Sequence, residues 1–100
     1  TNKFTPLHFS AYKGDVKMSQ TLIGLGADLN AQCDEGFTAL HLATAFGHLD
    51  LVQMLIGAEA NVNATDKCGN TPLHVAASEG LVMCQMLVRA GATVNVPNND

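Results

Sequence analysis

The sequence contains few basic residues, no tryptophan and no long apolar run. Five lysines and arginines stand against nine acids, and only Lys13 and Lys17 lie near each other, so the chain offers no basic stripe for phosphates. No apolar segment approaches the length of about 20 residues that a membrane-spanning helix needs. We therefore expect no nucleic-acid ligand and no direct membrane insertion.

Cysteine occurs three times, at Cys33, Cys68 and Cys84, which is an odd number without paired spacing. This usage fits a reducing compartment, cytoplasmic or nuclear, better than a secreted disulfide scaffold. The spacing also lacks the Cys-x-x-Cys and His-x-x-x-His pairs of zinc sites. Nucleophile-elbow, zinc-protease and Walker motifs are absent too, so we expect no metal, no cofactor and no catalytic activity.

A four-residue motif recurs along the chain. The tetrapeptides at 5–8 and 71–74 read Thr-Pro-Leu-His, the one at 38–41 reads Thr-Ala-Leu-His, and successive copies begin 33 residues apart. Each copy is followed at the same offset by a glycine, and these glycines are Gly14, Gly47 and Gly80. A fixed period of this length indicates an array of stacked structural repeats.

Each repeat unit predicts two helices. The motif threonine is suited to cap the first helix, with proline or alanine at its first position, and the following glycine to end it in the left-handed conformation. The first helices are expected at 6–13, 39–46 and 72–79, and the second helices at 16–24, 49–57 and 82–90. The third repeat is one residue shorter than the others, and aligning the repeats places the missing residue just after Gly80.

The expected core residues follow helical spacing. In the first helices, the motif leucine and the residue two places on are expected in the core, namely Leu7, Phe9, Leu40, Leu42, Leu73 and Val75. In the second helix of the middle repeat, the predicted apolar stripe is Leu49, Val52, Leu55 and Ile56.

A unit of 33 residues that opens with Thr-Pro-Leu-His and continues with a small pair such as Ala76 and Ala77 resembles the ankyrin repeat. The resemblance extends from end to end of the chain. It implies an all-α repeat solenoid, in which antiparallel helix pairs stack side by side and β-hairpin-like loops, or fingers, project beside them. It also implies a concave face made of fingertips and first helices.

We expect one ankyrin repeat domain over residues 1–100, with repeat 1 at about 1–33, repeat 2 at about 34–66 and repeat 3 at about 67–98. The first repeat is cut short, residues 96–100 resemble the start of a fourth finger, and neither end has the polar character of a capping repeat. The chain is therefore expected to be a monomeric piece of a longer protein.

Two positions depart from the repeat pattern. Glu59 replaces the glycine found at Gly26 and Gly91, where left-handed geometry costs a non-glycine residue about 1 kcal/mol, so we expect an earlier or looser end to that helix. Cys33 replaces the aspartate seen at Asp66 and loses an acceptor that could hold the turn. Both changes predict that the finger region of repeat 2 is the weakest part of the array.

His8, His41 and His74 recur with the repeat. A ligand or a general base is needed once, whereas a structural group is needed in every unit. We therefore expect buried imidazoles that bond to the N-cap threonine and to the backbone of the neighbouring repeat. His48 occupies a position where ankyrin repeats commonly carry histidine, and it is expected to be structural as well.

The aromatic residues all lie in repeats 1 and 2: Phe4, Phe9, Tyr12, Phe37 and Phe46. Phe9 has the position of a core leucine, whereas the other four resemble the variable, solvent-facing positions of ankyrin repeats. Four aromatic side chains on one side of the array predict an interface hot spot. Its expected polar rim is Lys13, Asp34, Glu35, Lys67 and Glu79. Alternatively, these rings pack against neighbouring repeats or fingers.

The resemblance implies a protein–protein interaction module that presents its concave surface to a protein or peptide partner. The residues expected to bind that partner are Tyr12, Asp34, Glu35, Phe37, Phe46, Lys67 and Asn70. Two alternatives stay open: a structural spacer in a longer ankyrin array, and the targeting part of a multidomain enzyme such as a kinase or a ubiquitin-ligase substrate receptor. The resemblance also implies that an intracellular asparaginyl hydroxylase can modify finger asparagines, here Asn30, Asn63 and Asn95, beside their hydrogen-bonding role in the finger.

Overall fold

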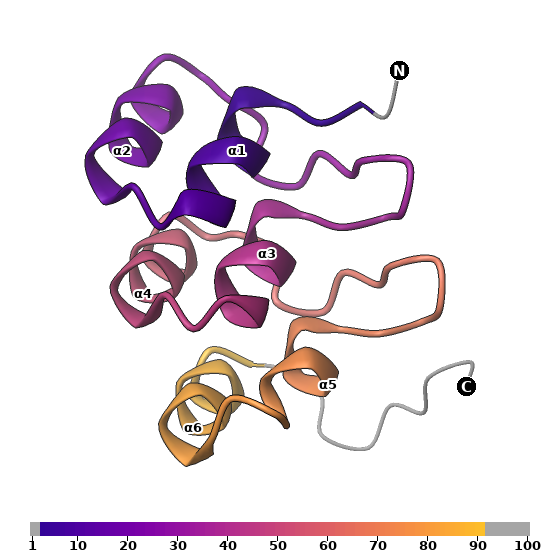
Figure 1. Cartoon of the computed structure of the whole chain (residues 1–100). Coiled ribbons are helices and arrows are strands. Elements are labelled where there is room, and N and C mark those ends of the chain that lie inside the picture. The colour runs from indigo at the N-terminus through magenta and orange to yellow at the C-terminus, as the bar shows by residue number, and fades with distance from the viewer. Residues whose placement is uncertain (1–2, 92–100) are drawn as a thin grey trace.

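The structure, a computed structural model, describes residues 3–91. Six helices follow one another along this part of the chain: α1 (Pro6–Lys13), α2 (Val16–Gly24), α3 (Ala39–Ala45), α4 (Leu49–Gly57), α5 (Pro72–Ala76) and α6 (Leu81–Arg89). Consecutive helices contact each other in pairs, and the pairs stack in a row through α1, α3 and α5 (Figure 1). The chain therefore forms the all-α repeat stack that the sequence predicts.

The motif threonines cap the first helix of every pair. The Oγ1 atom of Thr38 accepts the backbone N–H of His41, and the Nδ1 atom of the His41 ring accepts the backbone N–H of Thr38 at 3.1 Å. Thr5 with His8 and Thr71 with His74 form the same reciprocal pair. Because two otherwise unpaired N–H groups are satisfied at each helix start, the motif fixes the entry of the chain into the helix.

The third repeat departs most from the predicted helix boundaries. Helix α5 ends at Ala76 instead of 79, and α6 begins at Leu81, one residue earlier than expected. Gly80 has a φ of 106° and a ψ of 176°, so it is not in the left-handed helical conformation that was predicted for it. The reason is the missing residue after Gly80, because this glycine must serve as the N-cap of α6 and can no longer close the preceding helix.

Glu59 adopts the left-handed backbone conformation, with a φ of 72°. The prediction of an earlier helix end is wrong, because α4 ends at Gly57, the position equivalent to Gly24 in α2. The same two backbone bonds close both helices: Glu59 N–H donates to Ile56 O and Ala60 N–H to Leu55 O, as residues 26 and 27 do in repeat 1. These hydrogen bonds hold the strained residue in the geometry of its glycine counterpart.

The fingers are hairpin-like loops, and residues 3–91 contain no β-strand. In the first finger (residues 31–37) Cys33 N–H donates to Phe37 O at 3.1 Å, and in the second (residues 64–70) Asp66 N–H donates to Asn70 O at 3.0 Å. The Asp66 carboxylate also accepts the N–H groups of residues 68 and 70, a bond set that Cys33 cannot make. Lys67 N–H donates to Glu35 O at 3.0 Å and joins the two fingers.

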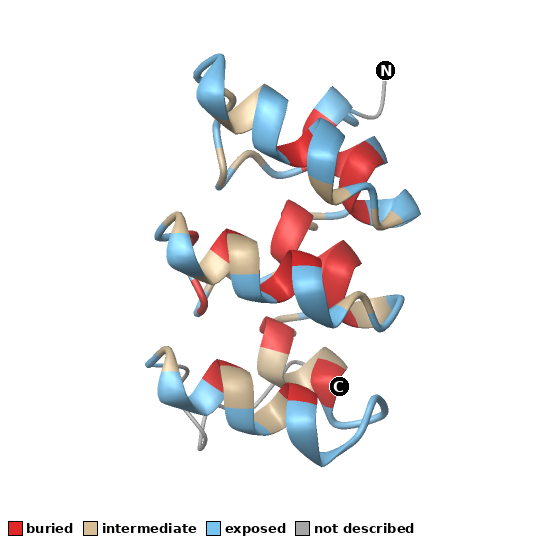
Figure 2. Ribbon diagram, turned by 90° about the vertical axis from the view of Figure 1, so that its left-hand side faces the viewer, coloured by how far each residue is buried: buried red, intermediate tan, exposed pale blue. Residues whose placement is uncertain are grey.

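The core is most complete in the middle repeat (Figure 2), because it is covered on both sides. Six of the seven residues of α3 are buried, and Leu40, Leu51 and Leu55 are fully enclosed. Two predicted core positions are wrong: Phe9 is 49% exposed and Leu49 is 39% exposed, with Leu51 buried instead. Leu49 is exposed because it is the first residue of α4, whereas Phe9 lies with Tyr12 on the exposed face of α1.

None of the helices in residues 3–91 is both long enough and apolar enough to cross a membrane.

Candidate functional site

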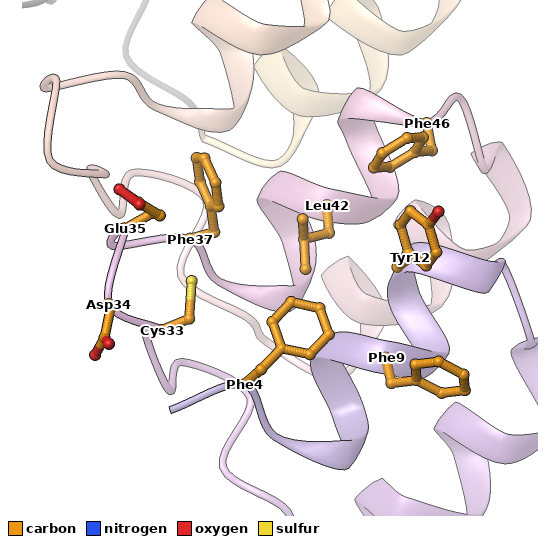
Figure 3. A pocket seen from close by; sticks show the side chains of 9 residues that line it. All are labelled: Phe4, Phe9, Tyr12, Cys33, Asp34, Glu35, Phe37, Leu42 and Phe46. Carbon is orange, nitrogen blue, oxygen red and sulfur yellow. The ribbon is translucent and has the colours of Figure 1, made fainter. Parts of the chain in front are cut away.

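A groove of about 520 Å³ lies between the first finger and the first two motif-bearing helices, α1 and α3 (Figure 3). We call it the aromatic groove, because every aromatic residue of the chain lines it. Its lining residues are Phe4, Phe9, Tyr12, Cys33, Asp34, Glu35, Phe37, Leu42 and Phe46.

On the helical side of the groove, the lining residues lie together because they are three or four positions apart along α1 and α3. Phe9 and Tyr12 stand three residues apart on α1, so both side chains project from one face of that helix. Leu42 on α3 and Phe46 at its C-cap are four residues apart and do the same. Since α1 and α3 pack side by side, Tyr12 meets Phe46 edge to face, with ring centroids 4.8 Å apart. Such a contact stabilises the pair by about 0.5–1.5 kcal/mol beyond burial.

The finger side of the groove is held by the motif histidines. Phe37 is half-buried, its ring lies 6.1 Å from that of His41, and its carbonyl oxygen lies 2.7 Å from His8 Nε2. Phe4, one repeat earlier in register, lies 5.1 Å from the ring of His8 and is 40% exposed. These contacts place both rings at the groove.

Residues 7–98 match the family model for ankyrin repeats in three copies. The chain belongs to the ankyrin repeat family. A search of curated proteins finds no match for it. Ankyrin repeats are commonly protein-binding modules, and the family match includes no catalytic domain.

Five of the seven residues predicted to bind a partner line the aromatic groove of this ankyrin array: Tyr12, Asp34, Glu35, Phe37 and Phe46. The other two, Lys67 and Asn70, belong to the second finger and do not line it. Lys67 is exposed beside Glu35, whereas Asn70 is partly buried and its side chain lies 3.5 Å from the Asp66 carboxylate. The backbone oxygen of Asn70 is also engaged by His41, so this residue has a structural role.

Phe4, which was expected in the aromatic hot spot, also lines the groove, whereas the prediction from sequence missed the other three lining residues, Phe9, Cys33 and Leu42. Phe9 and Leu42 were assigned to the core because they occupy equivalent core positions of repeats 1 and 2. The signal that could have separated them is the spacing of Phe9 and Tyr12, which puts both rings on one helix face. Cys33 is 8% exposed and lies at the base of the finger, a position that only the folded finger reveals.

The rim of the groove has a cation at the end of α1 and two carboxylates on the first finger. The Nζ atom of Lys13 lies 5.8 Å from the centroid of the Phe9 ring, an exposed cation–π contact of about 0.5–1 kcal/mol. The carboxylates of Asp34 and Glu35 are exposed on the finger, and neither has a hydrogen-bond or ion-pair partner within residues 3–91. Glu79, also predicted for the rim, lies beside Gly47 at the far end of α3.

The predicted structural role of His8 and His41 is confirmed. Both rings are 1% exposed, both bond to their own N-cap threonine, and each reaches a backbone oxygen of the next repeat. Desolvation by burial lowers the pKa of His41 below its ordinary value, outweighing the raising effects of its bond to Asn70 and of the Asp66 charge. No cluster of three or more potential metal ligands occurs in the described part of the chain.

The finger asparagines connect neighbouring repeats. Asn30 Oδ1 accepts the backbone N–H of Asn61 at 2.8 Å, and Asn63 Nδ2 donates to Gly91 O at 3.3 Å. These bonds agree with the hydrogen-bonding role expected of both residues, and their hydroxylation stays a prediction. Asn95, the third of the set, lies outside the described residues.

Proposed function

We propose that this ankyrin array is a non-catalytic protein–protein interaction module that binds a protein or peptide partner at its concave surface. The observation that carries the proposal is the gathering of all five aromatic residues around one open groove. Phe9 and Phe46 are 49% and 52% exposed, although full burial of such a side chain contributes about 1.5–3 kcal/mol. Apolar rings that stay exposed beside one another are typical of an interface.

The fixed shape of the surface supports the same proposal. The first finger is tied to α1 through the bond between His8 and Phe37, and to the second finger through the bond between Lys67 and Glu35. The second finger is tied to α3 through His41. Because groove and fingers are held in place before a partner arrives, binding orders few groups and loses little conformational entropy.

The proposal is tested by removing exposed rings from the groove. Phe46→Ala combined with Phe9→Ala should preserve the fold, because both side chains are about half exposed. Wild type and variant are each used to select from a displayed random-peptide library, and the affinities of the selected peptides are then measured. We expect the variant to bind peptides selected by the wild type at least about tenfold more weakly, as for the loss of interface hot spots.

A matched control removes apolar groups elsewhere. Leu81→Ala with Val82→Ala truncates two side chains on α6 that are 70% and 59% exposed and do not line the groove. These substitutions should leave the peptide affinities unchanged. Equal affinities of the wild type and the groove variant, with equal melting temperatures, would instead favour the spacer alternative.

We further propose a reducing compartment, cytoplasmic or nuclear, for the protein. Cys33, Cys68 and Cys84 are all free thiols, and Cys68 is exposed in the second finger. Whether the array is the targeting part of an enzyme is decided by the remaining domains of any longer chain that contains it. Expression of such a chain with and without the groove substitutions, followed by fluorescence microscopy, tests the compartment and the targeting role together.

A further inference from the structure

The aromatic groove carries charge of one sign. Asp34 and Glu35 are the two charged residues among those that line it, and the remaining lining residues are apolar or aromatic except for the Cys33 thiol and the Tyr12 hydroxyl. Lys13 stands by Phe9 but does not line the groove. The two charged residues therefore both stand on the finger side of the groove, where Figure 3 shows their carboxylate oxygens at the outer edge, directed away from the rings.

The two carboxylates are available for a ligand. Neither is used within residues 3–91 for a helix cap, a turn or an ion pair, whereas Asp15 caps α2 and Asp66 closes the second finger. Figure 3 shows Asp34 and Glu35 on the first finger beside Phe37, across the groove from Phe9, Tyr12 and Phe46 on the helices. The bond from Lys67 N–H to Glu35 O holds the backbone that carries them.

We propose, resting on the function proposed above, that the partner is an extended peptide segment bearing a bulky apolar side chain and, within a few residues, an arginine or lysine. The apolar side chain lies among Phe4, Leu42 and Phe46, and the cation lies at Asp34 and Glu35. Arginine is favoured over lysine, because its planar group can donate two parallel N–H bonds to one carboxylate, which the ammonium of lysine cannot do.

The charge of the chain disfavours an acidic partner at this place. The net charge is −4 at pH 7, and a carboxylate of the partner placed at Asp34 and Glu35 would be repelled without a cation of the groove to offset it. A volume of about 520 Å³ is also within the range of roughly 300–1,000 Å³ that is typical of clefts binding small ligands. The groove is thus large enough for a few side chains of a short segment.

The test uses a fluorescent positional-scanning library of 12-residue peptides and measures fluorescence polarisation with the 100-residue chain. We expect one position that prefers Phe, Leu or Trp and another that prefers Arg or Lys. From the consensus, matched peptides with Arg, Gln or Glu at the second position are made. Each is titrated against the wild type and against Asp34→Asn with Glu35→Gln.

The double variant should bind the Arg peptide about three- to tenfold more weakly and leave the affinity of the Gln peptide unchanged, as expected for exposed charge pairs. The difference should shrink as salt is raised. Asp50→Asn with Glu59→Gln is the matched control, since it removes two exposed carboxylates outside the groove. This control should retain the preference for the Arg peptide.

The outcomes separate the two proposals. Peptides that lose affinity on Phe46→Ala but show no preference for a cation, or a preference for Glu, overturn the basic-peptide inference and leave the groove as the binding site. Peptides whose affinity is unchanged by Phe46→Ala overturn the groove itself, and with it this inference. A total lack of peptide binding by the folded chain contradicts both.

Discussion

The Nε2 atom of His41 lies 2.9 Å from the backbone oxygen of Asn70, in the finger of the next repeat. The Nδ1 atom of the same ring accepts the backbone N–H of Thr38 at 3.1 Å, so the neutral ring must carry its proton on Nε2 and donate it to Asn70. One imidazole thereby caps its own helix and fixes the neighbouring finger. His8 makes the equivalent connection to Phe37.

His41→Ala should strongly destabilise the array. The substitution removes a fully buried ring, the acceptor of the Thr38 N–H and the bond to the next repeat. Together these losses should lower the free energy of unfolding by about 3 kcal/mol. Urea unfolding followed by circular dichroism measures the loss. His48→Ala is the control, because that ring is less buried and its bond to Tyr12 O is exposed; it should cost about 1 kcal/mol or less. Equal losses in the two variants would show that the inter-repeat bond has no special role.

Stability should decrease in mildly acidic solution because of His41. Its pKa in the folded state is lowered from 6.5 by desolvation, so the unfolded chain binds the proton more readily. The free energy of unfolding should therefore be constant above about pH 7 and fall as the pH falls below 6.5, towards the lower folded-state pKa. Urea titrations from pH 8 to pH 5 test the trend, and NMR of the His41 ring tests its origin. A His41 midpoint above 6.5 would contradict the prediction.

Thr44→Val should stabilise the protein. The Oγ1 atom of Thr44 is buried in α3 and has no hydrogen-bond partner within residues 3–91, while valine has nearly the same shape without the hydroxyl. An unsatisfied buried hydroxyl costs about 1–3 kcal/mol, so a gain of about 1 kcal/mol is expected in urea unfolding. Ser10 is the contrast, because its hydroxyl bonds to Leu7 O and lies 2.7 Å from that of Ser19. Ser10→Ala should therefore reduce stability, and a loss in Thr44→Val as well would show that the threonine hydroxyl is satisfied in solution.

Glu59→Gly should also stabilise the array, by about 0.5–1 kcal/mol, because glycine adopts a φ of 72° without the cost that a Cβ imposes. The gain is partly offset by the larger entropy of glycine in the unfolded chain. Gly26→Ala makes the reverse change at the equivalent position, where an added Cβ meets no atom within 4 Å. It should lose about 1 kcal/mol, measured as a fall in melting temperature. If Glu59→Gly left the melting temperature unchanged, the backbone strain at Glu59 would be negligible.

The sequence predicted several residues of the site but did not predict the complete set. Tyr12, Phe37 and Phe46 were expected on one side of the array because they resemble the variable, solvent-facing positions of ankyrin repeats, and they meet at one groove. Phe9 was assigned to the core by analogy with Leu42, yet its side chain is 49% exposed, whereas Leu42 is 8% exposed. Asn70 was expected at the partner surface, but its side chain and its carbonyl are both engaged within the protein.

The sequence by itself determined the repeat, the helices and the caps, because these depend on residues a few positions apart: a threonine and a histidine spaced by three, and a glycine or its substitute at a helix end. It also determined, through its period of 33 residues, that successive units stack. The tertiary structure alone decided which rings face outward and which carboxylates stay unpaired, because exposure depends on what the neighbouring repeat covers. The groove is formed by residues 4–46 that meet only when the first finger folds back against α1 and α3.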